Sequence, residues 1–101
     1  MYRFYSRRFL NLRGHHGGAY VLAVIEALPK GEAESRWARE ISLELADCSR
    51  RVSFEFPLTS ASDRRNSLRK ARLIAEVSAR FAMALELEAQ RAADVQSPIN
   101  D

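Results

Sequence analysis

The hydrophobic period of the chain changes once, and this change most limits the folds that the chain can adopt. Before Pro57 the apolar residues alternate, first on odd and then on even positions: Trp37, Ile41, Leu43, Leu45, Val52, Phe54 and Phe56. After Ser60 they recur three and four residues apart. A period of two indicates β-strands, and a period near 3.6 indicates an amphipathic helix. We therefore expect an α+β fold in which a β-hairpin leads into one long helix.

An antiparallel meander of three to four strands is expected before the helix. The strands should cover residues 9–12 (with an alternative start near residue 2), 20–28, 36–46 and 51–56. The glycine-rich segment Gly14–Gly18 should form a turn, and the polar segment 29–35 an exposed connection. Residues 20–28 are apolar on both faces, so this strand should be buried on both faces, and a partner subunit is one candidate cover for the second face.

The hairpin before the helix has a preferred register. If Leu45 faces Val52, the loop is Cys48–Ser49, although these residues suit the preferred primed turns poorly. A wider turn over residues 47–50 is an equal alternative. In either case Arg50 and Arg51 lie at the far end of the hairpin from the helix start.

The helix is expected from Ala61 to Ala92, about 45 Å long at 1.5 Å per residue. Candidate N-caps are Thr59, Ser60 and Ser62. The apolar arc, which should pack across one face of the sheet, is centred on Ile74, Val77, Phe81 and Leu85. Residues 1–94 are expected to form a single domain with a frayed tail at 95–101. The helix is long for such a domain, which favours a homodimer.

Composition narrows the class of protein. The longest apolar run, Ala19–Ile25, falls well short of the roughly 18 residues of a membrane span, so no membrane association is expected. A single cysteine, Cys48, cannot form a disulfide within the chain and favours the cytoplasm. The first residues carry arginines and no acid, which we interpret as a strand with exposed charges rather than a targeting segment.

No pattern in the sequence indicates catalysis. His15 and His16 are adjacent in the glycine-rich turn, where neighbouring side chains point apart, and no CxxC or HxxxH pattern supports a metal site. Nothing in the sequence places a histidine beside Cys48, as a thiol nucleophile would need. No pair of carboxylates has acid–base spacing. We therefore expect no enzyme, no metal and no cofactor.

Arginines are the best candidates for a binding function. The first surface combines the N-terminal arginines with the turn, and its candidate partner-binding residues are Arg7, Arg8, Arg13, His15 and His16. The second surface lies on the first turns of the helix, where the macrodipole also favours an anion, and comprises Arg64, Arg65, Arg69 and Arg72.

These features favour a small non-catalytic protein-interaction module, homodimeric, that binds a protein partner through the first surface. Its size and composition suit an inhibitor or adaptor of the kind encoded by phage or mobile elements. The alternative is a nucleic-acid-binding protein that uses the arginines of the second surface. The first predicts sensitivity to apolar substitutions, and the second predicts affinity that falls steeply with salt.

Overall fold

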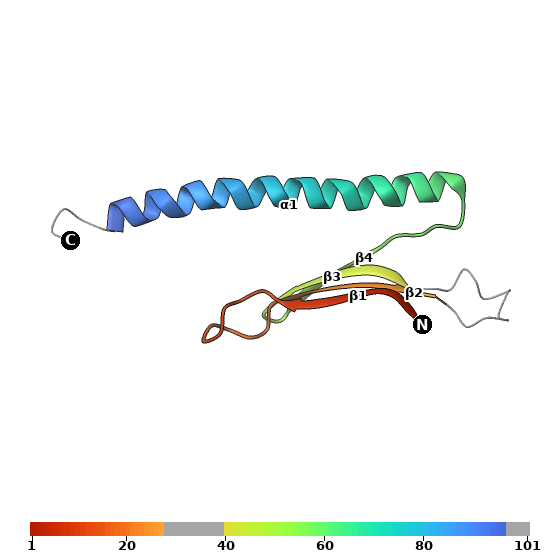
Figure 1. Cartoon of the computed structure of the whole chain (residues 1–101), viewed down its shortest axis with the longest axis horizontal. Helices are drawn as coiled ribbons and strands as arrows, with labels where there is room; N and C mark the ends of the chain where they lie inside the picture. Colours follow the sequence, from red (N-terminus) through yellow and green to blue (C-terminus); the bar gives the residue numbers. More distant parts are fainter. Residues whose placement is uncertain (28–39, 97–101) are drawn as a thin grey trace. The chain divides into compact units, whose positions relative to one another are not determined.

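The computed structural model describes residues 1–27 and 40–96. Its elements are β1 (Tyr2–Phe9), β2 (Tyr20–Glu26), β3 (Ile41–Asp47), β4 (Arg50–Glu55) and α1 (Ala61–Gln96). The strands form one antiparallel sheet in the order β1-β2-β3-β4, followed by the single long helix (Figure 1). The predicted α+β class and the meander are thus confirmed. The chain divides into two compact units, Met1–Ser67 and Leu68–Asp101, and the packing of α1 across the sheet stays a prediction.

β1 occupies the alternative position that the sequence allowed. It begins at Tyr2 and ends at Phe9, so the expected strand over residues 9–12 is wrong. The ladder to β2 closes where the Leu10 N–H donates to the Ala19 carbonyl at 3.0 Å, and the chain then turns at Gly14, whose φ of 94° lies in the left-handed region.

Other boundaries agree with expectation within a few residues. β2 ends at Glu26. β3 begins at Ile41, but the expected start of that strand near residue 36, with Trp37 and the connection over 29–35, lies outside the described residues. No helix within residues 1–27 and 40–96 combines the length and hydropathy needed to cross a bilayer.

The β3–β4 hairpin adopts the expected register. Leu45 pairs with Val52 and Asp47 with Arg50, which leaves Cys48 and Ser49 as a two-residue loop. Cys48 takes a φ of 58°, the left-handed conformation that such a loop demands and that residues other than glycine rarely adopt. A slip of one residue would turn the apolar side chains of both strands to the other face, so the apolar register outweighs the unfavourable turn sequence.

Strand pairing sorts the side chains onto two faces of the sheet. One face carries most of the apolar side chains, together with Ser6, Arg8, Asp47 and Arg50; its apolar members are Phe4, Val21, Ala23, Ile25, Ile41, Leu43, Leu45, Val52 and Phe54. The other mixes apolar, aromatic and charged groups, and there the Tyr20 hydroxyl donates to the Glu44 carboxylate. Among the described residues only small or medium apolar side chains are buried: Ala19, Val24, Ala27 and Ala46. The expected burial of β2 on both faces is therefore wrong: Val24 is buried on one face, but Ile25 on the other face is exposed.

Ser60 is the N-cap of α1. Its Oγ accepts the Asp63 N–H at 3.0 Å, and its carbonyl accepts the Arg64 N–H at 2.9 Å. The Thr59 hydroxyl donates to the Asp63 carboxylate at 2.6 Å. Ser67 is buried in the second turn, where its hydroxyl donates to the carbonyl of Pro57 at 2.7 Å. These contacts fasten the start of α1 to the segment that follows β4.

Most side chains of α1 after Ser67 are exposed, while Lys70 and Ile74 are partly buried. The helix ends at Gln96, four residues later than expected. Its predicted apolar arc exists in sequence, but Val77 is 61% and Phe81 65% exposed. Near the end of the helix, Arg91 forms an ion pair with Glu88 at 3.1 Å.

Candidate partner-binding site

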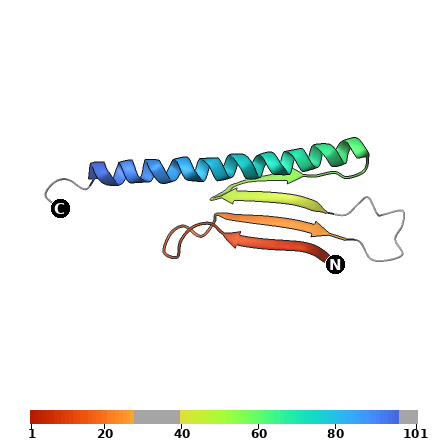
Figure 2. The ribbon, with the colours of Figure 1, turned by 45° about the horizontal axis from the view of Figure 1, so that its top comes forward.

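The two sharp reversals of the sheet lie at the same end. The β1–β2 connection covers residues 10–19, and the β3–β4 loop is Cys48–Ser49. Because Tyr20 pairs with Ala46, the start of β2 lies beside the end of β3 (Figure 2). We call residues 7–21 and 45–52 the turn end of the sheet.

Hydrogen bonds give the β1–β2 connection a defined shape. The Gly18 N–H donates to Nδ1 of His16 at 3.0 Å, and the Asn11 side-chain amide donates to the His16 carbonyl at 2.6 Å. A Cβ at position 18 would stand only 2.6 Å from Cε1 of His16. Glycine is therefore needed at position 18 for the imidazole to fold back onto its own loop.

His16 also reaches the opposite reversal, which corrects the expectation that no histidine lies near Cys48. The Cys48 sulfur is 3.8 Å from Nδ1 of His16. This nitrogen already accepts the Gly18 N–H, and the one polar group that holds residue 16 from outside, Asn11, binds its backbone rather than its ring. Within residues 1–27 and 40–96 no side chain donates to or accepts from the other ring nitrogen of His16, and the contact with Cys48 joins the two reversals.

No cluster that could hold a metal accompanies this pair. Across residues 1–27 and 40–96, three or more histidine, cysteine, aspartate or glutamate side chains are nowhere gathered. His15, the neighbour of His16 in sequence, is exposed.

A solvent-open hollow lies between the two reversals. Its volume is about 420 Å³, within the range of small ligand sites. Both reversals contribute to its lining, which consists of Leu10, Asn11, Ala19, Leu45, Ala46, Asp47, Arg50, Arg51 and Val52. Leu10 is 55% exposed and Val52 47% exposed, so apolar surface is accessible to a partner. The hollow can accept an aliphatic or aromatic side chain, with guanidinium groups beside it.

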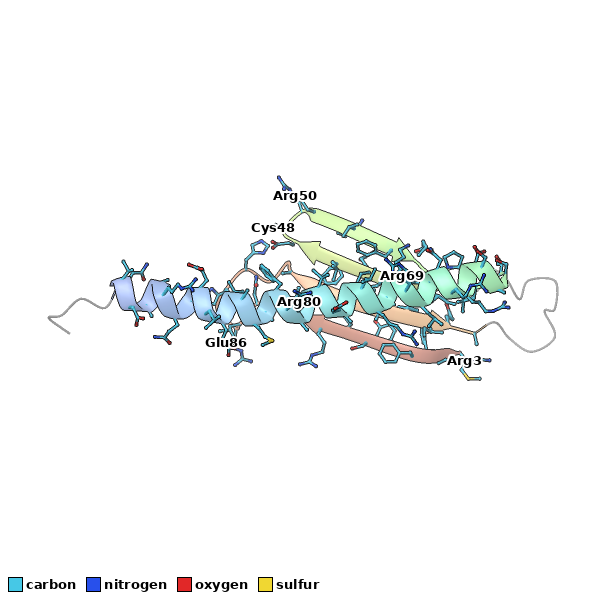
Figure 3. All side chains as sticks on the ribbon, turned by 90° about the horizontal axis from the view of Figure 1, so that it is seen from above. Arg3, Cys48, Arg50, Arg69, Arg80 and Glu86 are labelled. Carbon is cyan, nitrogen blue, oxygen red and sulfur yellow. The ribbon has the colours of Figure 1, made fainter. Side chains whose placement is uncertain are left out.

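Arginines from distant parts of the sequence lie at this end of the sheet, and two of them, Arg50 and Arg51, line the hollow. No local pattern grouped the N-terminal arginines with those of the β3–β4 hairpin, but pairing of β2 with β3 brings both sets to the turn end: Arg7, Arg8, Arg13, Arg50 and Arg51. None of the five forms an ion pair with another described residue. The nearby acids are Asp47 and Glu44, and Glu44 already accepts the Tyr20 hydroxyl. Figure 3 shows Arg50 beside Cys48 at this end and Arg3 at the opposite end.

The predicted partner-binding residues are only partly brought together. Arg7 pairs with Leu22 and Arg8 with Val21, so the two arginines point to opposite faces of β1. The Arg7 guanidinium lies over the rings of Phe9 and Tyr20, 5.2 and 5.9 Å from their centroids.

Arg13, His15 and His16 share the connection and are all exposed, and their role in partner binding stays a prediction. Sequence reasoning missed Leu10, Arg50 and Arg51 as members of this surface. The available signal was the register of β3 and β4, which places Arg50 and Arg51 at the hairpin tip.

The arginines of α1 form a separate surface. Arg65, Arg69 and Arg72 are exposed and, at 100° per residue, lie within about 60° of one another around the helix. Arg64 lies outside this sector, and its side chain donates to the Leu58 carbonyl at 3.3 Å. Of the four arginines predicted to bind nucleic acid, three therefore share one side of the helix.

No protein-family model, no curated protein and no solved structure matches the chain. The assignment of a function therefore depends on the residues of the turn end and of α1 themselves.

Proposed function

We propose that this protein is a small non-catalytic protein-interaction module, homodimeric, that binds an acidic segment of a protein partner at the turn end of the sheet. The observation that carries the proposal is the apolar hollow of about 420 Å³ lined by Arg50 and Arg51, which have no ion-pair partner among the described residues. We place the module in the cytoplasm, because its single cysteine, Cys48, is free.

The hollow supports binding of a side-chain anchor. Interfaces derive most of their affinity from a few apolar or aromatic groups that fill a pocket, surrounded by polar contacts. Leu10, Leu45 and Val52 offer the apolar wall, and Ala19 and Ala46 leave room because their side chains are small. A leucine, methionine or phenylalanine of the partner fits such a hollow.

The charges support an acidic partner. Arg50 and Arg51 line the hollow, and arginine binds carboxylates in a bidentate geometry that lysine cannot match. Arg13 extends the basic surface from the connection. A partner segment with carboxylates on either side of its apolar anchor would therefore match both the shape and the sign of the turn end.

A second candidate function is nucleic-acid binding through α1. It is favoured by the exposed arginine sector, Arg65, Arg69 and Arg72, at the basic end of the helix. Glu76 lies in the same sector, which weakens its attraction for phosphate. The turn end is less suited to this role, because base-stacking proteins offer free aromatic rings and the hollow has none in its lining.

The proposal is tested by selecting binders from a library of random displayed peptides. We expect enrichment of peptides that carry an aliphatic or aromatic anchor beside acidic residues. Arg51→Glu should weaken a selected peptide at least about 10-fold, the loss expected for one interface arginine. Leu10→Asp, at an exposed position, should weaken it to a similar degree without unfolding the sheet.

Arg80→Glu is the matched control, since it makes the same charge change on α1, far along the sequence from the turn end. It should leave the affinity unchanged. Selected peptides without acidic residues, or equal losses from Arg51→Glu and Arg80→Glu, would refute the proposed site. A mixed-sequence single-stranded oligonucleotide is also added as a competitor of the selected peptide. If it competes, and Arg69→Glu abolishes the competition, the function belongs to α1 and not to the turn end.

A further inference from the structure

α1 carries a seam of the kind that pairs helices. Four residues follow one another in steps of three, four and three: Ile74, Val77, Phe81 and Ala84. This is the heptad spacing at which one helix packs its side chains into another. Val77 and Phe81 are mostly exposed, and Leu85, on the flank of the seam, is 52% exposed. Ile74 is partly buried, but the exposed apolar remainder of the seam marks an interaction surface.

The length of α1 exceeds what its own sheet can cover. With 36 residues the helix is about 54 Å long. The longest strand, β1, has 8 residues and spans about 27 Å. Whichever way the helix and sheet are arranged, much of α1 extends beyond one sheet, and a second helix is the natural cover for it.

The charges of α1 identify that second helix and its direction. The first third of the helix is basic, with five basic residues against Asp63: Arg64, Arg65, Arg69, Lys70 and Arg72. The last third is acidic, with Arg91 against three acids: Glu86, Glu88 and Asp94. Two copies side by side in parallel would oppose like charges, whereas two antiparallel copies oppose basic to acidic and also align their helix dipoles favourably.

We infer that two copies of this chain pair through antiparallel α1 helices, with the two-fold axis at the level of Ala79. This register sets Val77 of each copy beside Phe81 of the other, and Ile74 beside Ala84, so that a large residue meets a small one. It also brings the acidic end of each helix level with the basic end of its partner. The inference rests on the homodimer in the proposed function and names the surface that forms it.

Cross-linking between seam positions tests the register directly. In a Cys48→Ser background, the double variant Ile74→Cys with Ala84→Cys should form a covalent dimer on mild oxidation, because the two positions meet across the interface. Each single variant should not, since its cysteine is separated from its own copy by about 15 Å along the helix axis. If each single variant forms the covalent dimer as readily as the double variant, the helices pair in parallel and the inference is overturned.

Solution mass separates this inference from the rest of the proposal. Light scattering of the unmodified chain should give twice the 11.5 kDa monomer mass. Phe81→Glu should give a folded monomer by circular dichroism, and Ala79→Glu, on the opposite side of the helix, should stay dimeric. If the Phe81→Glu variant is still a dimer and the double cysteine variant forms no cross-link, the helix pairing is overturned but the proposed homodimer stands. A monomeric unmodified chain, in which α1 covers its own sheet, overturns both and leaves peptide binding at the turn end to its own test.

Discussion

Ser67 offers a sharp test of how the start of α1 is held. Its side chain is 3% exposed, and its hydroxyl donates to the Pro57 carbonyl at 2.7 Å. Ser67→Ala removes this hydrogen bond, which is worth about 0.5–1.5 kcal/mol net. Pro57 is exposed, so water can replace the lost donor and the penalty should not exceed that range. Alanine favours a helix over serine by up to about 0.5 kcal/mol, which partly offsets the loss.

Ser78→Ala is the matched control, because Ser78 lies in the same helix but is exposed. It gains the same helix propensity and loses no buried hydrogen bond. Urea unfolding followed by circular dichroism, at one protein concentration, should place Ser67→Ala about 1 kcal/mol below Ser78→Ala in unfolding free energy. Equal stability of the two variants would show that the Ser67 hydroxyl does not fasten α1 to the segment after β4.

Three further substitutions test local features of the fold, each by the same unfolding measurement. Ser60→Ala should cost about 1 kcal/mol, because Asp63 loses the acceptor for its N–H at the helix start; an unchanged stability would mean that another residue caps α1. Cys48→Gly should raise stability by up to about 1 kcal/mol, because glycine relieves the left-handed φ of 58° and the sulfur contact that it removes, with His16, is exposed; a loss of stability would show that this contact outweighs the strain and contradict the prediction. Tyr20→Phe should cost about 0.5–1.5 kcal/mol through loss of the bond to Glu44, and a gain would argue against that bond.

Local patterns predicted the elements because each depends on residues close in sequence. The alternation through Leu43, Leu45, Val52 and Phe54 determined both the hairpin and its register, since any slip would turn these residues away from one face. The first strand was misplaced because Tyr2–Phe9 mixes aromatic residues with arginines and has no clean alternation. The bounds of this strand are set by its pairing with β2, which is a contact between segments distant in the sequence.

The candidate site was less predictable because it depends on pairing between segments far apart in the chain. Arg13 and His16 were chosen from composition alone, and both lie in the connection as expected. The meeting of His16 with Cys48, and of the connection with Arg50, follows from the pairing of β2 with β3. The helical periodicity identified Phe81 as part of an apolar arc, but periodicity does not indicate which surface covers that arc.

The central claim is that a partner binds at the turn end rather than along α1. Amide chemical shifts of the isotope-labelled protein, recorded while a selected acidic peptide is added, test it most directly. We predict saturable shifts at Leu10, Ala19, Ala46 and Arg51, which line the hollow, and little change along α1. Shifts confined to Arg65–Arg72, with the hollow unaffected, would contradict the account.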